Sequence, residues 1–181
     1  MITVELENFS LKEICQSGQC FRMKEAGENV YELIAGDKYL KISQQGTIVN
    51  FYCSDMEFIC YWVPYFDIDA DYSRYIKAIN PRDKYLVKAG ECGSGIRILQ
   101  QDLWEMIITF LISQQNNIAR IKGCIERLCH KYGKHLMAQD GTEYCSFPTV
   151  EELSVATEEE LRELGLGYRA RYLVETTRSI K

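Results

Sequence analysis

The sequence predicts an α+β fold, with an antiparallel sheet in the first part of the chain and helices in the rest. Up to about Ser54, short alternating runs are broken by Gly and Asp, which is typical of antiparallel strands with tight turns. Beyond that point apolar residues recur at helical spacing. A glycine-rich joint, "CGSG", follows at 92–95. We therefore expect a β-rich domain over 1–98 and a helical domain over 99–181.

The strand predictions rest on the runs "NVYELIAG", "KYLKISQQG" and "TIVNFYCS". Helices then begin with "SDMEFICYWVPYF", where Ser54 and Glu57 have the spacing of a capping box. A further helical stretch, "DADYSRYIKAI", is ended by "NPRD", which restarts another short helix. The β-rich half therefore includes its own helices before the glycine-rich joint.

The second half reads as a succession of capped helices. The stretch "LWEMIITFLIS" follows Asp102, and its apolar density predicts a core helix buried on nearly all sides. Glycines 165 and 167 break the chain before a last amphipathic helix. Two short helices are expected to begin at the capping boxes Thr149 with Glu152 and Thr157 with Glu160. The helix after residue 117 is expected to bury the face formed by Ile118, Ile121, Cys124, Ile125 and Leu128.

Composition bounds the class of protein. The chain has 181 residues, 46% of them hydrophobic, and a mean hydropathy of −0.23, which predicts a soluble globular protein with a sizeable core. The apolar run "MIITFLI" is too short to span a bilayer, and the N-terminal sequence lacks the pattern of an export signal. We expect a cytoplasmic monomer with no membrane partner.

Eight cysteines and two histidines limit the possible metal and disulfide chemistry. Without an export signal or a Cys-x-x-Cys pair, the cysteines are predicted to be reduced and mostly buried. His130 and His135 are the only histidines, and no second pair of ligands clusters with them. We therefore predict no metal site.

The net charge of −5 argues against a nucleic-acid partner, but the distribution of charge reverses that inference. Residues 1–114 carry eleven basic and sixteen acidic side chains, whereas 115–134 carry five basic and one acidic, and 168–181 carry four basic and one acidic. Either the two basic segments bind phosphates or they are solvated helix faces.

Three segments, in order and at matching spacing, carry a resemblance that extends over essentially the whole chain. They are "SGQCFRM" (17–23), "ISQQNNIARIKGCIERLC" (112–129) and "LGLGYRARYL" (164–173). The chain resembles the 8-oxoguanine DNA glycosylases of the helix-hairpin-helix superfamily. The resemblance implies a sheet domain like half of a TATA-binding protein, packed on a partial all-helical glycosylase domain, and basic segments that converge on DNA.

An enzyme that works on a base within a duplex must extrude it, fill the space and satisfy the orphaned partner base. Tyr168, on a glycine-containing turn at the start of a helix, is a candidate wedge. Cytosine presents two acceptors and one amino donor, which Arg120 and Arg169 could serve together with the amide oxygen of Gln115 or Asn116. The alternative is that Tyr168 and Arg169 cap a helix and pair with the acids of "TEEELRE".

The segment "SGQCFRM" would act on the lesion itself. Oxidised guanine carries a hydrogen on ring nitrogen 7, so a backbone carbonyl aimed there attracts it and repels guanine. The resemblance assigns this carbonyl to Gly18, with Phe21 and Arg22 supporting the loop. The alternative for Gly18 is an ordinary turn glycine before a strand.

The sequence departs from the family in two places. Gln115 stands where well-known eukaryotic members have an asparagine, which changes the reach of the amide and weakens the expectation of strict cytosine recognition. The nucleophilic lysine, the glycine-rich hairpin and the assisting aspartate of the family do not occur, so we expect no catalytic residue in this chain. It is then either a fragment of a longer enzyme or a degenerate protein, and we favour the fragment.

The resemblance implies a parent enzyme of base-excision repair that removes 8-oxoguanine and cleaves the abasic site through a lysine imine, without a cofactor. Its partner would be double-stranded DNA containing an oxidised guanine, and in a bacterium the enzyme would be associated with the nucleoid. The 181-residue chain itself is predicted to be inactive, because its lysines read as surface residues, the terminal Lys181 among them. Two alternatives are an alkylated-purine DNA glycosylase and a non-catalytic DNA-binding module, although the latter would require basic strands and the β-rich half is acidic.

Overall fold

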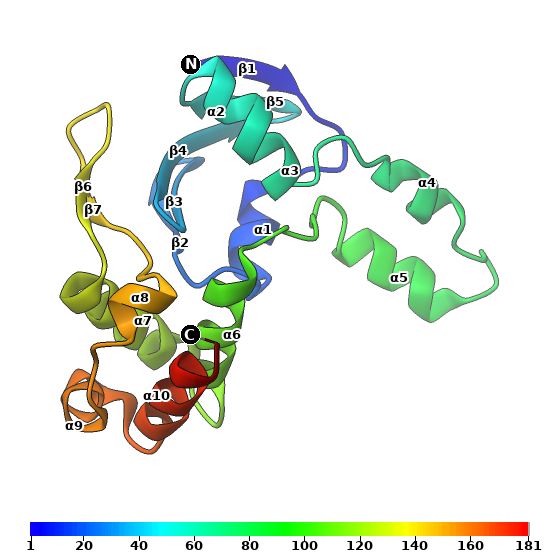
Figure 1. The fold of residues 1–181 in the computed structure, drawn as a ribbon. Coiled ribbons are helices and arrows are strands. Elements are labelled where there is room, and N and C mark those ends of the chain that lie inside the picture. The colour runs from blue at the N-terminus through cyan, green and yellow to red at the C-terminus, as the bar shows by residue number, and fades with distance from the viewer. Residues whose placement is uncertain (181) are drawn as a thin grey trace. The chain divides into compact units, whose positions relative to one another are not determined.

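The computed structural model describes residues 1–180, which form two compact units. The first, here the sheet unit, contains Met1–Leu33 and Leu40–Gln100. The second, here the helical unit, contains Ile34–Tyr39 and the chain from Gln101 onward. Together they give the predicted α+β fold, with strands first and helices after them (Figure 1).

The sheet has five strands in the order β1-β5-β4-β3-β2, and the predicted antiparallel sheet is confirmed. A short helix that was not predicted, α1 (Leu11–Gln16), connects the first two strands and is capped by the Ser10 side chain. The strands are β1 (Ile2–Glu5), β2 (Met23–Gly27), β3 (Val30–Ala35), β4 (Lys38–Gln45) and β5 (Ile48–Tyr52).

An aromatic cluster forms the core of the sheet unit. Phe51 on β5 lies edge-on against Phe66, with ring centroids 5.9 Å apart, and Phe66 meets Phe9 at 5.6 Å. Trp62 is fully buried, and its indole N–H donates to Glu57 over 2.9 Å. Trp62 and Phe66 belong to a continuous helical segment that begins at the predicted Ser54 cap and ends at Phe66. It consists of α2 (Asp55–Glu57), the π-helical turn η1 (Phe58–Trp62) and α3 (Val63–Tyr65).

Two further helices of the sheet unit form a hairpin, α4 (Tyr72–Lys77) and α5 (Lys84–Cys92). The predicted break at "NPRD" separates them, and Asp83 caps α5 by accepting from two backbone N–H groups. Both helices lie entirely within the described residues, and neither contains a buried residue. The hairpin projects away from the strands (Figure 1).

The helical unit contains the remaining helices, and both predicted capping boxes are confirmed. The side chains of Thr149 and Thr157 each accept from the backbone N–H three residues on. The side chains of Glu152 and Glu160 in turn accept from the backbone N–H of these threonines. The elements are α6 (Leu103–Ser113), α7 (Ile118–Tyr132), α8 (Val150–Leu153), α9 (Glu158–Leu161), the π-helical turn η2 (Arg162–Leu166) and α10 (Arg169–Ile180).

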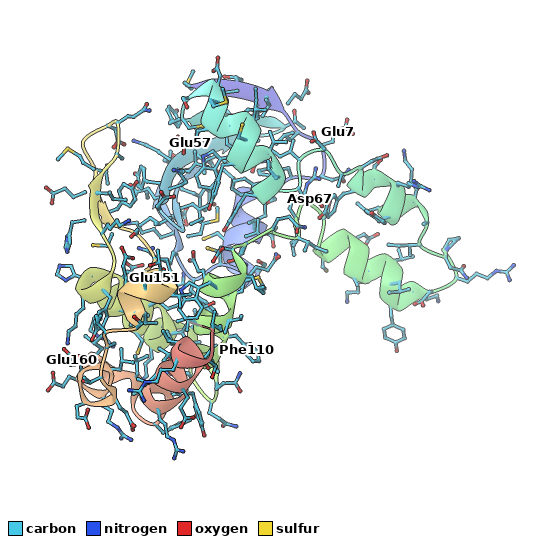
Figure 2. All side chains as sticks on the ribbon, viewed as in Figure 1. Glu7, Glu57, Asp67, Phe110, Glu151 and Glu160 are labelled. Atoms are coloured by element: carbon cyan, nitrogen blue, oxygen red, sulfur yellow. The ribbon has the colours of Figure 1, made fainter. Side chains whose placement is uncertain are left out.

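The prediction that α6 is buried on nearly all sides is wrong. Ile108 and Ile112 are buried, but Leu103, Met106 and Phe110 lie on an exposed face, and Phe110 is 66% exposed (Figure 2). Apolar density shows that a helix is hydrophobic but not which of its faces the described chain covers. Ile118, predicted to be buried on α7, is likewise exposed, because it occupies the first turn of that helix beside an exposed loop.

The expectation of an all-helical second domain is wrong in one place. A two-stranded antiparallel hairpin, β6 (His135–Met137) and β7 (Glu143–Cys145), follows α7. Its turn contains Asp140 and Gly141, and Gly141 has φ +85°, which is the chemistry of a tight turn. The Asp-Gly pair is the sequence signal for this hairpin.

The cysteines are free thiols in the structure, and the prediction that they are mostly buried holds for only half of them. Burial raises the pKa of the Cys53 thiol to about 11. No helix among residues 1–180 is both long and apolar enough to cross a membrane. The buried thiols are Cys20, Cys53, Cys124 and Cys129, whereas Cys15 and Cys145 are half-buried and Cys60 and Cys92 are exposed.

Candidate functional site

The segment 114–117 forms a tight loop between α6 and α7 in the helical unit. The backbone of Gln115 has φ +50°, which lies in the left-handed region that residues other than glycine rarely adopt. Asn116 donates from its amide to the Ile112 carbonyl at 3.1 Å, and Asn117 caps α7 by accepting from Arg120 N–H at 3.0 Å. The loop is therefore closed by its own amides at both ends.

Arg169, the first residue of α10, holds this loop from the other side. Its Nε donates to the Gln114 carbonyl at 2.7 Å, and its Nη2 donates to the same oxygen and, at 2.8 Å, to the Gln115 carbonyl. The side chain is almost completely buried, with 3% exposed. Tyr168 adds a hydroxyl donor to the Gln114 carbonyl at 3.3 Å. A strained backbone persists only where its surroundings fix it, and these donors do so.

A second set of contacts ties α7 to the turn of "LGLGYRARYL". Arg120 Nη2 donates to the Gly165 carbonyl at 3.3 Å, and Arg127 Nε donates to the Leu164 carbonyl at 2.7 Å. Gly165 has φ +85°, so the backbone conformation favours glycine, and a Cβ there would lie 2.9 Å from Arg127 Nη2 and displace the end of that side chain. Arg127 was not predicted as a site residue, although it lies within the same segment as Arg120.

The result is one surface on which several predicted residues come together. The Tyr168 ring is 48% exposed, and the Arg169 guanidinium carbon lies 4.5 Å from its centroid. Gln115 and Arg120 are exposed beside it, each tied by its backbone or side chain to the contacts above. This surface, hereafter the loop surface, offers an aromatic ring, a primary amide and a guanidinium to a ligand.

The structure distinguishes among the predicted roles of these residues. The Asn116 amide oxygen accepts from Asn117 N–H at 3.1 Å, whereas the Gln115 side chain is exposed on the loop. Arg169 donates to the loop carbonyls rather than pairing with the acids of "TEEELRE", where Arg162 instead pairs with Glu158. A direct contact of Arg169 with a base stays a prediction.

Several cations of the two basic segments are paired within the protein. Lys131 lies 3.2 Å from Glu160, and Lys134 lies 3.6 Å from Glu152. Arg171 pairs with Glu175 at 2.8 Å. Hydrogen bonds from the Thr157 backbone and from Lys131 lower the pKa of Glu160 to about 2, so this acid is ionised at neutral pH. The number of basic residues therefore overstates the positive charge that the segments present.

Gly18 and Phe21 belong to the sheet unit and lie in the connection between α1 and β2. Gly18 is exposed with φ +79°, and a Cβ at this position would meet no atom of the described chain within 4 Å. The backbone conformation, not crowding, therefore favours glycine. Gln19 anchors the loop, because its amide donates to the Arg97 carbonyl at 2.9 Å and accepts from Leu99 N–H at 3.0 Å. Phe21 is half-buried.

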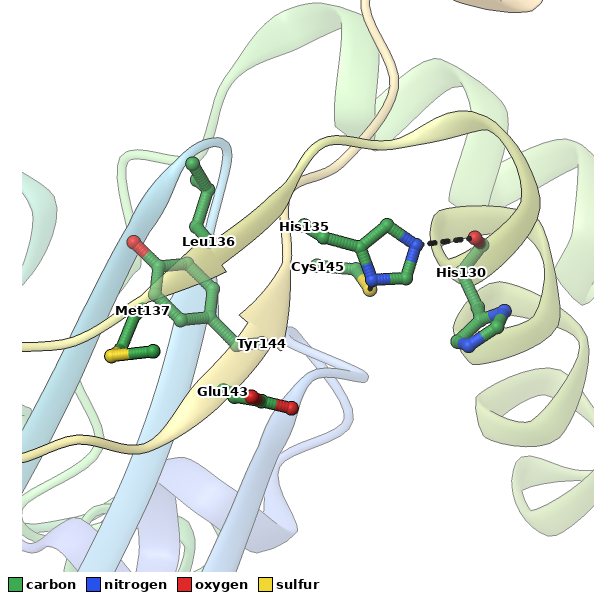
Figure 3. A pocket seen from close by; sticks show the side chains of 7 residues that line it. All are labelled: His130, His135, Leu136, Met137, Glu143, Tyr144 and Cys145. Carbon is green, nitrogen blue, oxygen red and sulfur yellow. Dashed lines mark hydrogen bonds between the residues drawn. The ribbon is translucent and has the colours of Figure 1, made fainter.

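A separate hollow of about 510 Å³ opens in the helical unit, beside the β6–β7 hairpin (Figure 3). His135 Nδ1 lies 3.6 Å from Cys145 Sγ, and its Nε2 lies 3.3 Å from the His130 carbonyl. Across residues 1–180, no group of three His, Cys, Asp or Glu side chains is arranged to hold a metal ion. The hollow also contains no residue of the loop surface.

Two family profiles and several relatives match the chain. The profile described as "8-oxoguanine DNA glycosylase, N-terminal domain" matches residues 1–107, and "HhH-GPD superfamily base excision DNA repair protein" matches 108–181. The Saccharomyces cerevisiae N-glycosylase/DNA lyase is 33% identical over 99% of this chain and 51% of its own length. The chain thus spans about half the length of the curated relatives it matches.

Solved structures agree with this assignment. The apo form of the Clostridium acetobutylicum 8-oxoguanine glycosylase/lyase is 40% identical, with a TM-score of 0.92 over 97% of this chain and 61% of that one. The same enzyme in complex with double-stranded DNA containing cytosine opposite 8-oxoguanine gives 37% identity and a TM-score of 0.92, over 99% and 65% of the two chains. Since the first profile alone covers more than half of the residues, the chain belongs to the 8-oxoguanine DNA glycosylase family.

Proposed function

We propose that this protein acts in base-excision repair as an 8-oxoguanine DNA glycosylase with associated lyase activity, on double-stranded DNA containing an oxidised guanine. The loop surface is the observation that carries the proposal. When a base is extruded, the gap in the stack must be filled and the unpaired partner base must be hydrogen-bonded, and Tyr168, Arg120 and Gln115 offer the groups for these two tasks. The predicted boundary near residue 98 and the monomeric state are part of the same proposal.

The loop surface has a distinct task for each of its groups. The exposed Tyr168 ring enters the base stack as a wedge. Its hydroxyl bond to the Gln114 carbonyl and the adjacent Arg169 guanidinium hold the ring in place beside the loop. The Arg120 guanidinium serves the acceptors of the orphaned cytosine, and the Gln115 amide oxygen accepts from its amino group. Arg169 acts chiefly as a positioning residue, because its guanidinium donates to the loop carbonyls.

Lesion recognition is assigned to the connection after α1. Gly18 supplies a backbone carbonyl for the hydrogen on ring nitrogen 7 of the oxidised base, and Phe21 supports the connection. Gln19 is added to this assignment, because its two hydrogen bonds fix the backbone directly after Gly18. Gln19→Ala is expected to reduce discrimination between oxidised and normal guanine.

The chemistry requires a neutral lysine amine that displaces the base and forms an imine with the deoxyribose. Such a lysine must be desolvated or lie near another cation. None of the described lysines is buried. Desolvation opposes the charged form of Lys131, but its interactions with Glu160 and Tyr132 together outweigh that effect and raise the pKa of the amine. The prediction for Lys181 lies outside the described residues. We expect the nucleophile outside the 181 residues.

The deciding experiment is borohydride trapping on a duplex with 8-oxoguanine opposite cytosine. The 181-residue chain is compared with any longer product of the same gene. We expect a covalent adduct with the longer product and none with the 181-residue chain. An adduct on the 181-residue chain would overturn the placement of the nucleophile, and a longer product that neither excises the base nor is trapped would overturn the proposed function.

Opposite-base recognition is tested by Arg120→Ala in the product that excises the base. The variant is expected to lose about 1 to 3 kcal/mol of preference for cytosine opposite the lesion, because one guanidinium donor to the base is removed. Lys134→Ala is the control, since Lys134 is paired with Glu152 away from the loop surface. Equal weakening against all four opposite bases would reduce Arg120 to a phosphate contact.

A further inference from the structure

The positive charge of the sheet unit is concentrated on the α4–α5 hairpin. Residues 72–92 contain five basic side chains and two acidic ones, whereas residues 1–71 contain five basic and twelve acidic ones. The net charge of 1–114 as a whole hides this contrast. Of the two acids of the hairpin, Asp83 accepts from the Tyr85 and Leu86 N–H groups at the start of α5, and Glu91 lies near the end of that helix.

The cations of the hairpin point into solvent. Arg74, Lys77, Arg82, Lys84 and Lys88 are all exposed, and within the described chain none lies in an ion pair. Neighbouring like charges repel each other, so this arrangement favours binding of an anion that spans them. The paired lysines of the helical unit lack this property.

The hairpin is fixed at its root, so its cations are held away from the sheet. Arg97 is buried there and donates to the carbonyls of Asp67, Ala70 and Glu7 at 2.9 to 3.1 Å. Its guanidinium carbon lies 4.2 Å from the centroid of Tyr72, whose hydroxyl donates to Asp67 at 2.9 Å. Figure 2 marks Asp67 at this root.

The tip of the hairpin is open and carries both charge and an aromatic ring. Asn80 accepts from Arg82 N–H at 3.0 Å, and Asp83 caps α5, so local hydrogen bonds shape the turn. A shallow hollow of about 490 Å³ lies there, lined by Asn80, Arg82, Asp83, Lys84 and Tyr85. Tyr85 is 91% exposed and Tyr75, on α4, is 67% exposed.

The cations come from both helices of the projecting hairpin and from the turn between them. A small phosphorylated molecule would need convergent donors, whereas a row of cations matches the line of charges of DNA, about one per 1.7 Å of duplex. Exposed tyrosine hydroxyls can also donate hydrogen bonds to the phosphate oxygens of a duplex. Resting on the proposed function, we infer that the α4–α5 hairpin is a second, lesion-independent contact site for the phosphate backbone of duplex DNA.

The test measures binding of the 181-residue chain to undamaged duplex DNA across a salt series. Two variants each change the formal net charge of −5 by the same amount, at exposed or half-buried side chains, so that overall charge is matched. The hairpin variant carries Lys77→Gln, Arg82→Gln, Lys84→Gln and Lys88→Gln, and the control variant carries Lys12→Gln, Lys24→Gln, Lys38→Gln and Lys41→Gln.

For the hairpin variant we expect weaker binding and a salt slope that is lower by about 0.9 for each phosphate that the protein no longer neutralises. The control variant is expected to keep the slope of the unmodified chain. Equal reductions in both variants would show an effect of net charge alone and overturn the proposal. Unchanged slopes in both would overturn it as well.

The exposed apolar residues of the hairpin suggest one rival ligand, an anionic lipid surface. Vesicles of phosphatidylcholine with phosphatidylserine are therefore tested beside the DNA. Vesicle binding that only the hairpin variant loses, with DNA binding unchanged, would overturn the proposal in favour of a membrane contact. Undamaged DNA isolates the hairpin from lesion recognition, so a failure here leaves the proposed function intact, and a failure of borohydride trapping leaves the hairpin result intact.

Discussion

The two basic regions of this protein use their charge in opposite ways. In the helical unit Lys131 and Lys134 pair with acids, and Arg127 and Arg169 donate to backbone carbonyls. On the α4–α5 hairpin the exposed cations lie outside the ion pairs of the described chain. Similar local excesses of positive charge therefore build a folded surface in one case and present charge to solvent in the other.

This difference explains why the number of charges alone is a weak guide to function. The basic segments 115–134 and 168–181 predict a DNA contact, yet several of their cations are paired with acids or donate to carbonyls within the protein. What remains for a ligand there is specific: Arg120, the Gln115 amide and the Tyr168 ring. The loop surface is thus suited to recognising one base, and the hairpin to holding a polyanion.

The strongest test of the comparison is the stability of Arg169→Ala beside Arg82→Ala. Removing the buried guanidinium leaves the carbonyls of Gln114 and Gln115 without their donors, so we expect the free energy of unfolding to fall by about 3 kcal/mol. Arg82→Ala on the hairpin is expected to change it by less than about 0.5 kcal/mol. Urea denaturation followed by circular dichroism measures both.

Equal stability of these two variants would contradict the positioning role of Arg169. Arg169→Lys refines the result, because a lysine keeps the charge but cannot donate along the two directions that the guanidinium uses. Arg169→Lys is therefore expected to recover only part of the free energy of unfolding that Arg169→Ala loses. Full recovery would mean that charge alone, without the fork of donors, holds the loop.

Much of the fold could be predicted because its determinants are local. Alternation indicated the strands, and Ser54, Asp102, Thr149 and Thr157 marked helix starts that the structure confirms. Which face of α6 is covered could not be predicted, because that depends on partners distant in sequence, such as the Gly36 N–H that binds buried Glu105 at 2.8 Å. The pattern of apolar residues does not indicate such contacts.

The candidate site was predictable in its members but not in its internal hydrogen bonds. The family resemblance indicated Gln115, Arg120 and Tyr168 together, and the structure connects their segments through backbone carbonyls. No property of a sequence states that an arginine will donate to a carbonyl instead of a ligand. Arg169 was for this reason predicted as a base contact without its positioning role, and Arg127 was not predicted at all.

A smaller effect is expected from Gln115→Asn. The left-handed conformation of Gln115 costs less for asparagine, which enters that region several-fold more often than other non-glycine residues. We expect the free energy of unfolding to rise by about 0.5 kcal/mol, of the order seen when a residue is matched to its backbone conformation. Denaturation of Gln114→Asn, where φ is −55°, is the matched control and should show no gain.

Binding measurements extend the same substitution. Asparagine is one methylene shorter, so the amide would reach less far from the loop surface. If the present glutamine relaxes recognition of the opposite base, Gln115→Asn should increase the preference for cytosine in the product that excises the lesion. A gain in stability without any change in that preference would separate the conformational role of residue 115 from base recognition.

The smallest expected effect concerns the paired cations of the helical unit and depends on pH. Glu160 has a pKa of about 2 in the folded protein, against an ordinary value of 4.5, because the Thr157 backbone and then Lys131 stabilise its ionised form. A carboxyl whose pKa is lower in the folded state stabilises the fold above its unfolded pKa, and this contribution is lost as the pH falls from about 4.5 to about 2.

Glu160→Gln should therefore reduce the slope of stability with pH in that window, in urea titrations at several pH values. Glu159→Gln, on the same helix but outside the capping box, should retain the slope of the unmodified chain. If both variants keep that slope, the pairing of Lys131 contributes nothing measurable, and the contrast between the two basic regions would rest on Arg127 and Arg169 alone.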